Sequence, residues 1–395
     1  MPGTSLQRFF APCPRGLEEV LAQELGALGA QAARAVPGGV GFEGPFSLCY
    51  AANLESRLAS RILWHVGQAG YRGESDVYDA VRRLPWPELF DVRRTLMVKV
   101  SAHDCPLRSL DFITLKIKDA VCDAFRAKRG ERPSVDTRAP EVRVHVFFER
   151  ARFDVYLDTS GPPLFQRGLR VQSGTAPLRE NLAAGILKLA GWEPGMPFFD
   201  PMCGTGTFLL EAAQMAVGQA AGLNRRFGFE NLAPFDDGLW HRLREAARAR
   251  QKPIAPQPIF GGDLYGEALK GAAENLRRAG LEGVVSLKQA NVLEANPPSD
   301  PGVLVTNPPY GVRLGDQEDL AAFYPRLGDH LKQRFAGWRV YLFTADLRLP
   351  KLIRLSPSRR IPLFNGPLEC RLYEFKIVQG SMRGRTATDT APPPQ

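Results

Sequence analysis

The sequence predicts a chain in two parts, an α+β region followed by an α/β region with a mostly parallel, doubly wound sheet. From about residue 178, short apolar strands alternate with helical patterns, which is typical of parallel sheets with helices on both faces. Two of these strands end in polar residues and tight turns, "DPMCGTGT" and "TNPPYG". The residues before 160 mix strands and helices without that alternation. A chain of 395 residues is also too long for one ordinary core.

The first part contains two groups of elements. In residues 1–50, the strand-like "RFFAPCP" precedes a helix whose apolar residues recur at helical spacing until Gly29 ends it. In residues 51–160, a long amphipathic helix is expected to end at Gly130, and four segments read as strands. These strands are expected at 60–67, 96–102, 142–148 and 152–158. The mixture predicts a small α+β region.

After a linker at 161–180, the α/β region is expected to cover residues 181–380. Its strands are expected at 197–200, 258–263, 284–289, 302–306 and 339–345, and its helices at 207–220, 265–280 and 318–335. The segment 222–257 shows no clear pattern and is expected to be irregular. The polar, proline-rich residues 381–395 are expected to be disordered.

Composition narrows the class of protein. The chain is 44% hydrophobic and 24% charged, as globular proteins are, and its net charge of +9 permits a polyanionic partner without requiring one. The six cysteines form no CxxC pair and the five histidines no ligand spacing, so we expect no disulfide framework and no metal site. Neither a signal peptide nor a membrane span is evident. We therefore expect a soluble cytoplasmic protein.

The stretch "DPMCGTGT" connects the first α/β strand to its helix. Gly204 and Gly206 let the backbone approach a ligand, and the helix offers free N–H groups. Leu209 stands where a dinucleotide fingerprint has its third glycine, and no lysine follows as in a P-loop. A GxG turn behind Asp200 suits S-adenosylmethionine, whose sulfonium and amino groups are cationic. Taken alone, the glycines are also compatible with a plain tight turn.

Two further polar residues follow the next strands. Asp263 ends the second strand, where a carboxylate can accept both hydroxyls of a ribose, although it can equally cap the helix that follows. Asn291 follows the third strand, where it can contact the adenine edge or remain in a solvated loop. The residues beside them, Leu264 and Val292, belong to the same predicted cofactor site.

The fourth strand ends in "TNPPYG". Pro308 and Pro309 have no N–H, so the loop presents hydrogen-bond acceptors only. The Asn307 side-chain oxygen and the Pro308 carbonyl can accept both N–H groups of an exocyclic amine on a nucleobase. Tyr310 offers a face on which a flipped base can stack. The predicted chemistry is methyl transfer to that amine by alignment and charge stabilisation, without a strong base or a metal.

With these motifs placed, the chain resembles a known family along nearly its whole length. The matching stretches include "LKIKDAVCDAF", "RPSVDTRAPEVRVHV", "APLRENLAAGIL", "PFFDPMCGTGTFLLEAA", "TNPPYG" and "NGPLEC". It is similar to the THUMP-domain RNA methyltransferases, above all the RlmL-like bacterial enzymes that make N2-methylguanosine in 23S rRNA. The resemblance implies a ferredoxin-like region at 1–50, an RNA-gripping THUMP domain at 51–160, and a Rossmann-like methyltransferase domain at 181–380.

The resemblance also assigns roles to residues. The cofactor would lie against Asp200, Cys203, Gly204, Gly206, Asp263 and Asn291, with Pro177 and Leu178 closing over its methionine end; Asn307, Pro308 and Tyr310 would hold the guanine N2. The family usually has Asp where this chain has Asn291, so we expect weaker cofactor affinity. Lys116, Lys118, Arg167 and Arg170 are candidates for RNA contact, although a solvated helix face and a linker explain them equally well.

The sequence thus predicts an S-adenosylmethionine-dependent RNA guanine-N2 methyltransferase that acts on 23S rRNA. The nearest alternative is the same reaction on tRNA, which the motifs do not separate. A protein glutamine as acceptor would leave the THUMP-like part without a role. A non-catalytic RNA-binding assembly factor would be expected to have lost Asp200, Asp263 or Asn307, and all three are present.

Overall fold

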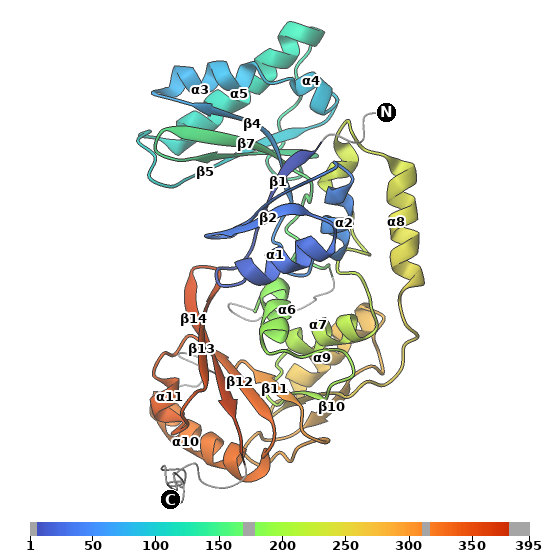
Figure 1. Cartoon of the computed structure of the whole chain (residues 1–395), viewed down its shortest axis with the longest axis vertical. Coiled ribbons are helices and arrows are strands. Elements are labelled where there is room, and N and C mark those ends of the chain that lie inside the picture. Colours follow the sequence, from blue (N-terminus) through green and yellow to red (C-terminus); the bar gives the residue numbers. More distant parts are fainter. Residues whose placement is uncertain (1–5, 169–177, 310–316, 379–395) are drawn as a thin grey trace, which may run out of the picture.

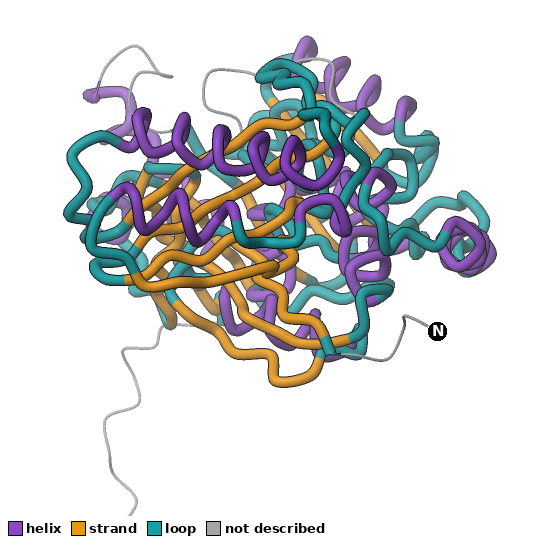
Figure 2. Tube along the Cα trace, turned by 90° about the horizontal axis from the view of Figure 1, so that it is seen from above, coloured by secondary structure: helices purple, strands orange, loops and turns teal. Residues whose placement is uncertain are grey.

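The computed structural model describes residues 6–168, 178–309 and 317–378. Within these ranges the strands form two seven-stranded sheets, one in each part of the chain, with orders β2-β3-β1-β4-β7-β6-β5 and β10-β9-β8-β11-β12-β14-β13. Figure 1 shows the two parts one above the other, and Figure 2 shows helices lying along the strands. No helix of the described residues is both long and apolar enough to cross a lipid bilayer.

The N-terminal sheet joins both groups of elements expected in the first part. Its elements are β1 (Gln7–Pro12), α1 (Glu18–Ala27), β2 (Gln31–Val36), β3 (Gly39–Gly44), α2 (Leu48–Glu55), β4 (Leu63–Gly70), α3 (Glu74–Arg82), α4 (Trp86–Leu89), β5 (Leu96–Ala102), α5 (Leu110–Arg129), β6 (Val142–Phe148) and β7 (Arg152–Asp158). The join is an antiparallel pairing of β1 with β4, in which Phe9 lies opposite Trp64. The two groups therefore share one sheet.

Helix α5 illustrates why the sequence folds as it does. Ser109 caps its start by accepting the Phe112 N–H at 3.2 Å, and Gly130 ends it in the left-handed conformation, with φ of 77°. The predicted end of this helix is confirmed. Its buried face includes Ile113 and Ile117, and α5 and α3 cover one face of the sheet (Figure 1).

The second part is the predicted doubly wound sheet. Its elements are α6 (Glu180–Leu189), β8 (Phe198–Asp200), α7 (Thr207–Ala216), the 3-10 helix η1 (Gly228–Asn231), α8 (Asp237–Ala249), β9 (Ile259–Asp263), α9 (Gly266–Arg278), β10 (Ser286–Gln289), β11 (Val303–Thr306), α10 (Gln317–Arg334), β12 (Arg339–Thr344), α11 (Leu349–Leu352), β13 (Arg359–Asn365) and β14 (Leu368–Lys376). Strands β8 to β12 are parallel, and β14 pairs antiparallel with β12 and β13. The mostly parallel sheet is confirmed.

The expectation for segment 222–257 is wrong in part. It contains α8, a helix of 13 residues whose start Asp236 caps by accepting the Leu239 N–H at 2.9 Å. Trp240 and Ala247 are buried in it, and Leu239 and Leu243 pack against the same core. These four apolar residues recur at helical spacing, so the sequence carried a helical signal that the prediction did not use. Trp240 packs edge-on against Phe229, with ring centroids 5.0 Å apart.

The two parts pack against each other through a buried ion network. Glu211 of α7 is fully buried and lies 3.2 Å from both the Arg57 and the Arg167 guanidinium. Arg57 follows α2 in the N-terminal part, and Arg167 also donates to the carbonyls of Leu164 and Arg57. The same apolar cluster includes buried residues of both parts. Burial strengthens these hydrogen bonds and ion pairs. The network therefore holds the two parts of the chain in one arrangement.

Candidate functional site

The predicted cofactor residues lie at the carboxyl edge of the second sheet. Strand β8 has β9 on one side and β11 on the other, and all three are parallel. Their carboxyl ends therefore meet at one edge, which brings Asp200, Asp263 and Asn307 together. Strand order reverses at β8, because the chain continues to β9 and β10 on one side and to β11 on the other. Ligands of doubly wound sheets bind at such a switch point.

The glycine turn between β8 and α7 has the conformation that its sequence predicts. Gly204 and Gly206 have φ of 54° and 79°, which residues with side chains rarely adopt. A Cβ on Gly206 would lie 3.0 Å from the Ala272 Cβ, so this glycine allows α9 to pack closely. A Cβ on Gly204 would meet no atom within 4 Å. The backbone at Gly204 therefore faces open space, where a ligand can approach it.

Asp200 is a buried carboxyl at the centre of this edge, with 2% of its surface exposed. Burial raises its pKa to about 7, and the neighbouring Asp263 adds to the rise, while the hydrogen bond from the Met202 N–H opposes it. A carboxylate buried in this way is stabilised by an approaching cation. This property fits the amino or sulfonium group of S-adenosylmethionine.

Asp263 joins two turns of the site. Its Oδ2 accepts the Gly204 N–H at 2.9 Å, and its Oδ1 accepts the Tyr265 N–H at 3.0 Å. Each carboxylate oxygen has a further lone pair, so both can still accept a ribose hydroxyl. Asn275 of α9 supports the same turn by donating to the Thr205 carbonyl at 2.9 Å, a contact that the sequence pattern of α9 did not indicate.

Asn307 carries the most informative atom of the site. Its side-chain Oδ1 is buried and has no hydrogen-bond partner among the described residues. Burying an acceptor without a partner costs free energy, so this oxygen is poised for an N–H that a ligand brings. Pro308 is buried, and the Pro309 carbonyl accepts the hydroxyl of Tyr324 at 2.8 Å. Tyr324 of α10 thereby holds the loop, a role that its helical pattern alone did not reveal.

The remaining cofactor candidates differ in their surroundings. Leu264 is 52% exposed beside Asp263, and Val292 is 6% exposed within an apolar cluster. Asn291 uses its Oδ1 to accept the Leu293 N–H at 3.0 Å. Cys203 is a buried thiol whose pKa burial raises far above its usual range. Leu178 is buried, whereas Pro177 and Tyr310 lie outside the described residues.

Of the four residues predicted to contact RNA, two are partly exposed, one is buried, and one lies outside the described residues. Lys116 and Lys118 lie partly exposed on α5, with Lys116 over the Phe112 ring and Lys118 paired with Asp119 at 2.7 Å. Arg167 does not fit the prediction, because it is 4% exposed and paired with Glu211. Its guanidinium joins the two parts of the chain instead of facing solvent. Arg170 lies outside the described residues.

The residues at this edge fit S-adenosylmethionine better than the alternatives. Two carboxylates suit its cationic groups and its ribose, and the backbone at Gly204 is open to a ligand. In the described parts of the chain, no group of three or more metal-ligating side chains occurs.

Three family models match the chain, at separate ranges. A model of the RlmL ferredoxin-like domain matches residues 8–63, and a THUMP domain model matches 71–158. An RMKL-like methyltransferase domain model matches residues 167–374. The chain belongs to the RlmL-like family of THUMP-domain RNA methyltransferases. It is thus a methyltransferase of the family that uses S-adenosylmethionine, and RNA is its class of substrate.

Known proteins similar to this RlmL-like chain match it end to end. A Synechocystis sp. protein called "Putative RNA methyltransferase slr0064" is 36% identical over 383 residues, covering 95% of this chain and all of the relative. A solved structure described as "SMU.472, a putative methyltransferase complexed with SAH" is 30% identical, with a TM-score of 0.87 over 95% of this chain and 99% of that chain. A Listeria monocytogenes structure described as "a predicted N6-adenine-specific DNA methylase" is 27% identical, with a TM-score of 0.85 over 94% and 96%.

Proposed function

We propose that this protein transfers a methyl group from S-adenosylmethionine to the exocyclic N2 amine of a guanosine in 23S rRNA. The observation that carries the proposal is the buried, unpartnered Oδ1 of Asn307. It lies at the end of β11, next to β8 and the glycine turn that follows it. An amine N–H is the group that would satisfy this oxygen, and its position orients the amine toward the cofactor.

The protein's contribution to the reaction is orientation and charge stabilisation. Asn307 Oδ1 and the Pro308 carbonyl accept the two N–H groups, which directs the N2 lone pair at the methyl carbon. S-adenosylmethionine supplies an electrophilic methyl group. The N2–C bond forms as the C–S bond breaks, and the N2 proton leaves to water. The two acceptors oppose the positive charge that develops on nitrogen.

The family, and not the geometry around Asn307, supports guanine N2 in 23S rRNA as the target. An exocyclic amine also occurs on adenine and cytosine, and the loop after β11 would accept any of these. The RlmL ferredoxin-like and THUMP matches support an rRNA substrate of the RlmL-like kind. The presence of Asp200, Asp263 and Asn307 argues against a non-catalytic assembly factor.

The test uses methyl-labelled S-adenosylmethionine with deproteinised 23S rRNA, 16S rRNA and bulk tRNA in separate reactions. Digestion to nucleosides then identifies the product. We expect N2-methylguanosine in 23S rRNA and in neither of the other RNAs. Label in tRNA guanosine would support the proposed reaction but contradict 23S rRNA as the substrate. Label in adenosine would contradict guanine as the target base. No label in any RNA, with normal cofactor binding, would favour the assembly factor.

A further inference from the structure

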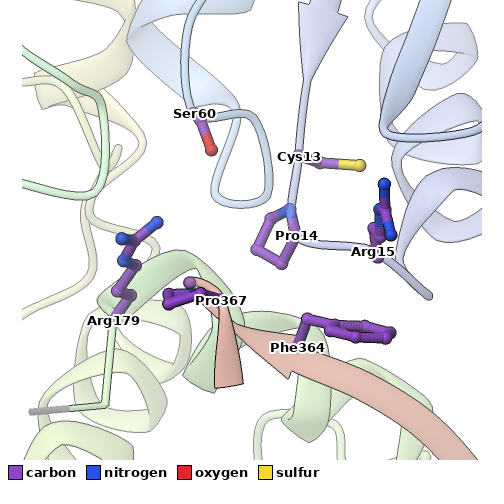
Figure 3. A pocket seen from close by; sticks show the side chains of 8 residues that line it. Cys13, Pro14, Arg15, Ser60, Arg179, Phe364 and Pro367 are labelled. Atoms are coloured by element: carbon purple, nitrogen blue, oxygen red, sulfur yellow. The ribbon is translucent and has the colours of Figure 1, made fainter. Parts of the chain in front are cut away.

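A cavity of about 430 Å³ lies where the N-terminal part meets the methyltransferase domain (Figure 3). Its walls come from four segments far apart in the sequence: the loop after β1, the loop before β4, the residue before α6, and the turn between β13 and β14. Two arginines line it, Arg15 and Arg179, and none of the described residues in its walls is acidic. The cavity therefore has a cationic character.

The cavity lies beyond the same sheet edge as the reactive loop. Strand β14 runs antiparallel to β12, and Arg371 of β14 pairs with Thr344, the last residue of β12. The turn at Gly366 is five residues earlier in the chain, which carries it up to about 17 Å past the carboxyl end of β12. Asn307 follows β11, the parallel neighbour of β12. The cavity and Asn307 therefore lie beyond the same edge of the sheet.

Both arginines are held by aromatic rings. The Arg15 guanidinium lies 5.7 Å from the centre of the Phe364 ring, and that of Arg179 lies 4.9 Å from the centre of Phe165. Neither has an acidic partner among the described residues. A guanidinium that stacks through its flat face keeps the N–H groups at its edge available. Such pre-oriented donors match the oxygens of a phosphate group.

Glycine at position 366 leaves room for the Arg179 guanidinium. Its φ is 65°, and a Cβ there would lie 3.1 Å from Arg179 Nη2, so the Arg179 guanidinium lies directly against the turn. Strand β13, which leads into this turn, approaches the N-terminal part, because a Cβ on Gly16 would clash with the Pro362 carbonyl oxygen. The two arginines come from different parts of the chain and lie on opposite sides of the cavity, with Pro14 and Pro367 between them (Figure 3).

The other polar groups of the cavity do not suggest a second chemistry. Burial raises the pKa of the Cys13 thiol to about 12, with Glu18 and Glu24 contributing, so Cys13 stays neutral and is no nucleophile. The Ser60 hydroxyl oxygen accepts the Asn181 side-chain N–H at 3.1 Å, and its O–H can still donate to a ligand. The arginines and this hydroxyl are hydrogen-bond donors, and the charge of the arginines selects an anion.

We propose that this cavity binds the phosphate backbone of the RNA substrate, on the strand that carries the target nucleotide, through Arg15 and Arg179. The inference rests on the proposed function only in that RNA is the substrate; it does not depend on which base is methylated. A phosphate held here keeps the strand in place while its target base is turned out toward Asn307. Because each arginine belongs to a different part of the chain, the site is complete only when both parts are present.

The test compares full-length protein with the R15Q, R179Q and R15Q/R179Q variants. Binding of RNA is measured by filter retention over a range of NaCl concentrations. We expect the double variant to bind RNA about tenfold more weakly, and the slope of log K against log [NaCl] to fall by between one and two. The KM for RNA should rise, while kcat at saturating RNA and the affinity for S-adenosylhomocysteine should stay within about twofold.

Two further variants keep the result interpretable. R15K/R179K retains the charges and should recover most of the salt slope. R334Q removes an exposed charge at the end of α10, which returns to the amino edge of the sheet, and should leave RNA affinity nearly unchanged. A loss in R15Q/R179Q no greater than that in R334Q would overturn the proposal, and so would a fall in kcat with KM unchanged.

A third measurement separates an RNA phosphate from a free one. Inorganic phosphate is titrated into the protein at constant ionic strength. If the double variant loses phosphate binding and keeps normal RNA binding, the cavity takes a small anion and the proposal is wrong. The nucleoside product identified for the wild-type protein tests the proposed function independently, because a different methylated base would leave the arginine effects on RNA binding intact.

Discussion

The N–H of Gly204 donates to Asp263 Oδ2 over 2.9 Å, which ties the glycine turn after β8 to the end of β9. The two motifs that mark the cofactor site are thus parts of one hydrogen-bonded unit. Replacement of Asp263 by alanine removes both the proposed ribose acceptor and the hydrogen bond to the Gly204 N–H. We expect the affinity for S-adenosylhomocysteine to fall at least tenfold, as measured by calorimetry. Asp263→Asn, which can keep the tie to Gly204 through its oxygen, should lose less.

Asn307 is expected to be needed for turnover and not for cofactor binding. Asn307→Ala removes the oxygen that accepts the target amine, so kcat/KM should fall at least a hundredfold, about 2.7 kcal/mol of transition-state stabilisation. The variant should bind S-adenosylhomocysteine as the wild type does. The measurement is single-turnover methyl transfer to RNA. Activity within threefold of the wild type would rule out the proposed role of this side chain.

Asp200 should make cofactor binding depend on pH. Its pKa is about 7 in the ligand-free protein, and a cationic ligand favours the ionised form, so binding lowers that pKa. Affinity should therefore rise about tenfold from pH 6 to pH 8 and change little above that. Calorimetry at these pH values tests this, with Asp200→Asn as control. The control should bind weakly and lose the dependence; an equal dependence in both proteins would assign it to another group.

Glu211 is expected to be important for stability because it is buried between two guanidiniums. Glu211→Gln leaves Arg57 and Arg167 buried without a counter-charge, and breaking such a pair costs about 3–5 kcal/mol. The midpoint of thermal unfolding should therefore fall by several degrees. Glu245→Gln, which breaks an exposed pair with Arg248, should change stability by less than about 1 kcal/mol. Equal effects of the two substitutions would contradict the structural role of Glu211.

The parts of the site that follow from chain order were predictable from the sequence. Alternating strands and helices predict a parallel sheet, and a parallel sheet brings all its carboxyl ends to one edge. The placement of Asp200, Asp263 and Asn307 at that edge required no knowledge of side-chain packing. The same local reasoning predicts the end of α5 at Gly130, since a glycine C-cap acts within one turn.

The parts that depend on distant partners were not predictable in this way. Arg167 is an ordinary basic residue in the sequence, and only the fold places it beside Glu211, 44 residues further along. The cavity of Arg15 and Arg179 likewise requires four segments to meet, and none carries a local signal for it. Helix α8 is a different case, because its apolar residues Leu239, Trp240, Leu243 and Ala247 recur at helical spacing and were sufficient to predict it.

The pairing of β1 with β4 has a consequence for any attempt to divide the protein. Strand β4 occupies the gap between the ferredoxin-like and THUMP matches, so a cut there would divide β4 or separate it from β1 or from β7, and would leave backbone N–H and C=O groups without partners. Exposed edges of this kind recruit strands from other molecules, so each fragment would tend to aggregate. The two N-terminal modules, distinct as sequence families, share one sheet in this chain, and a fragment designed to fold should contain both.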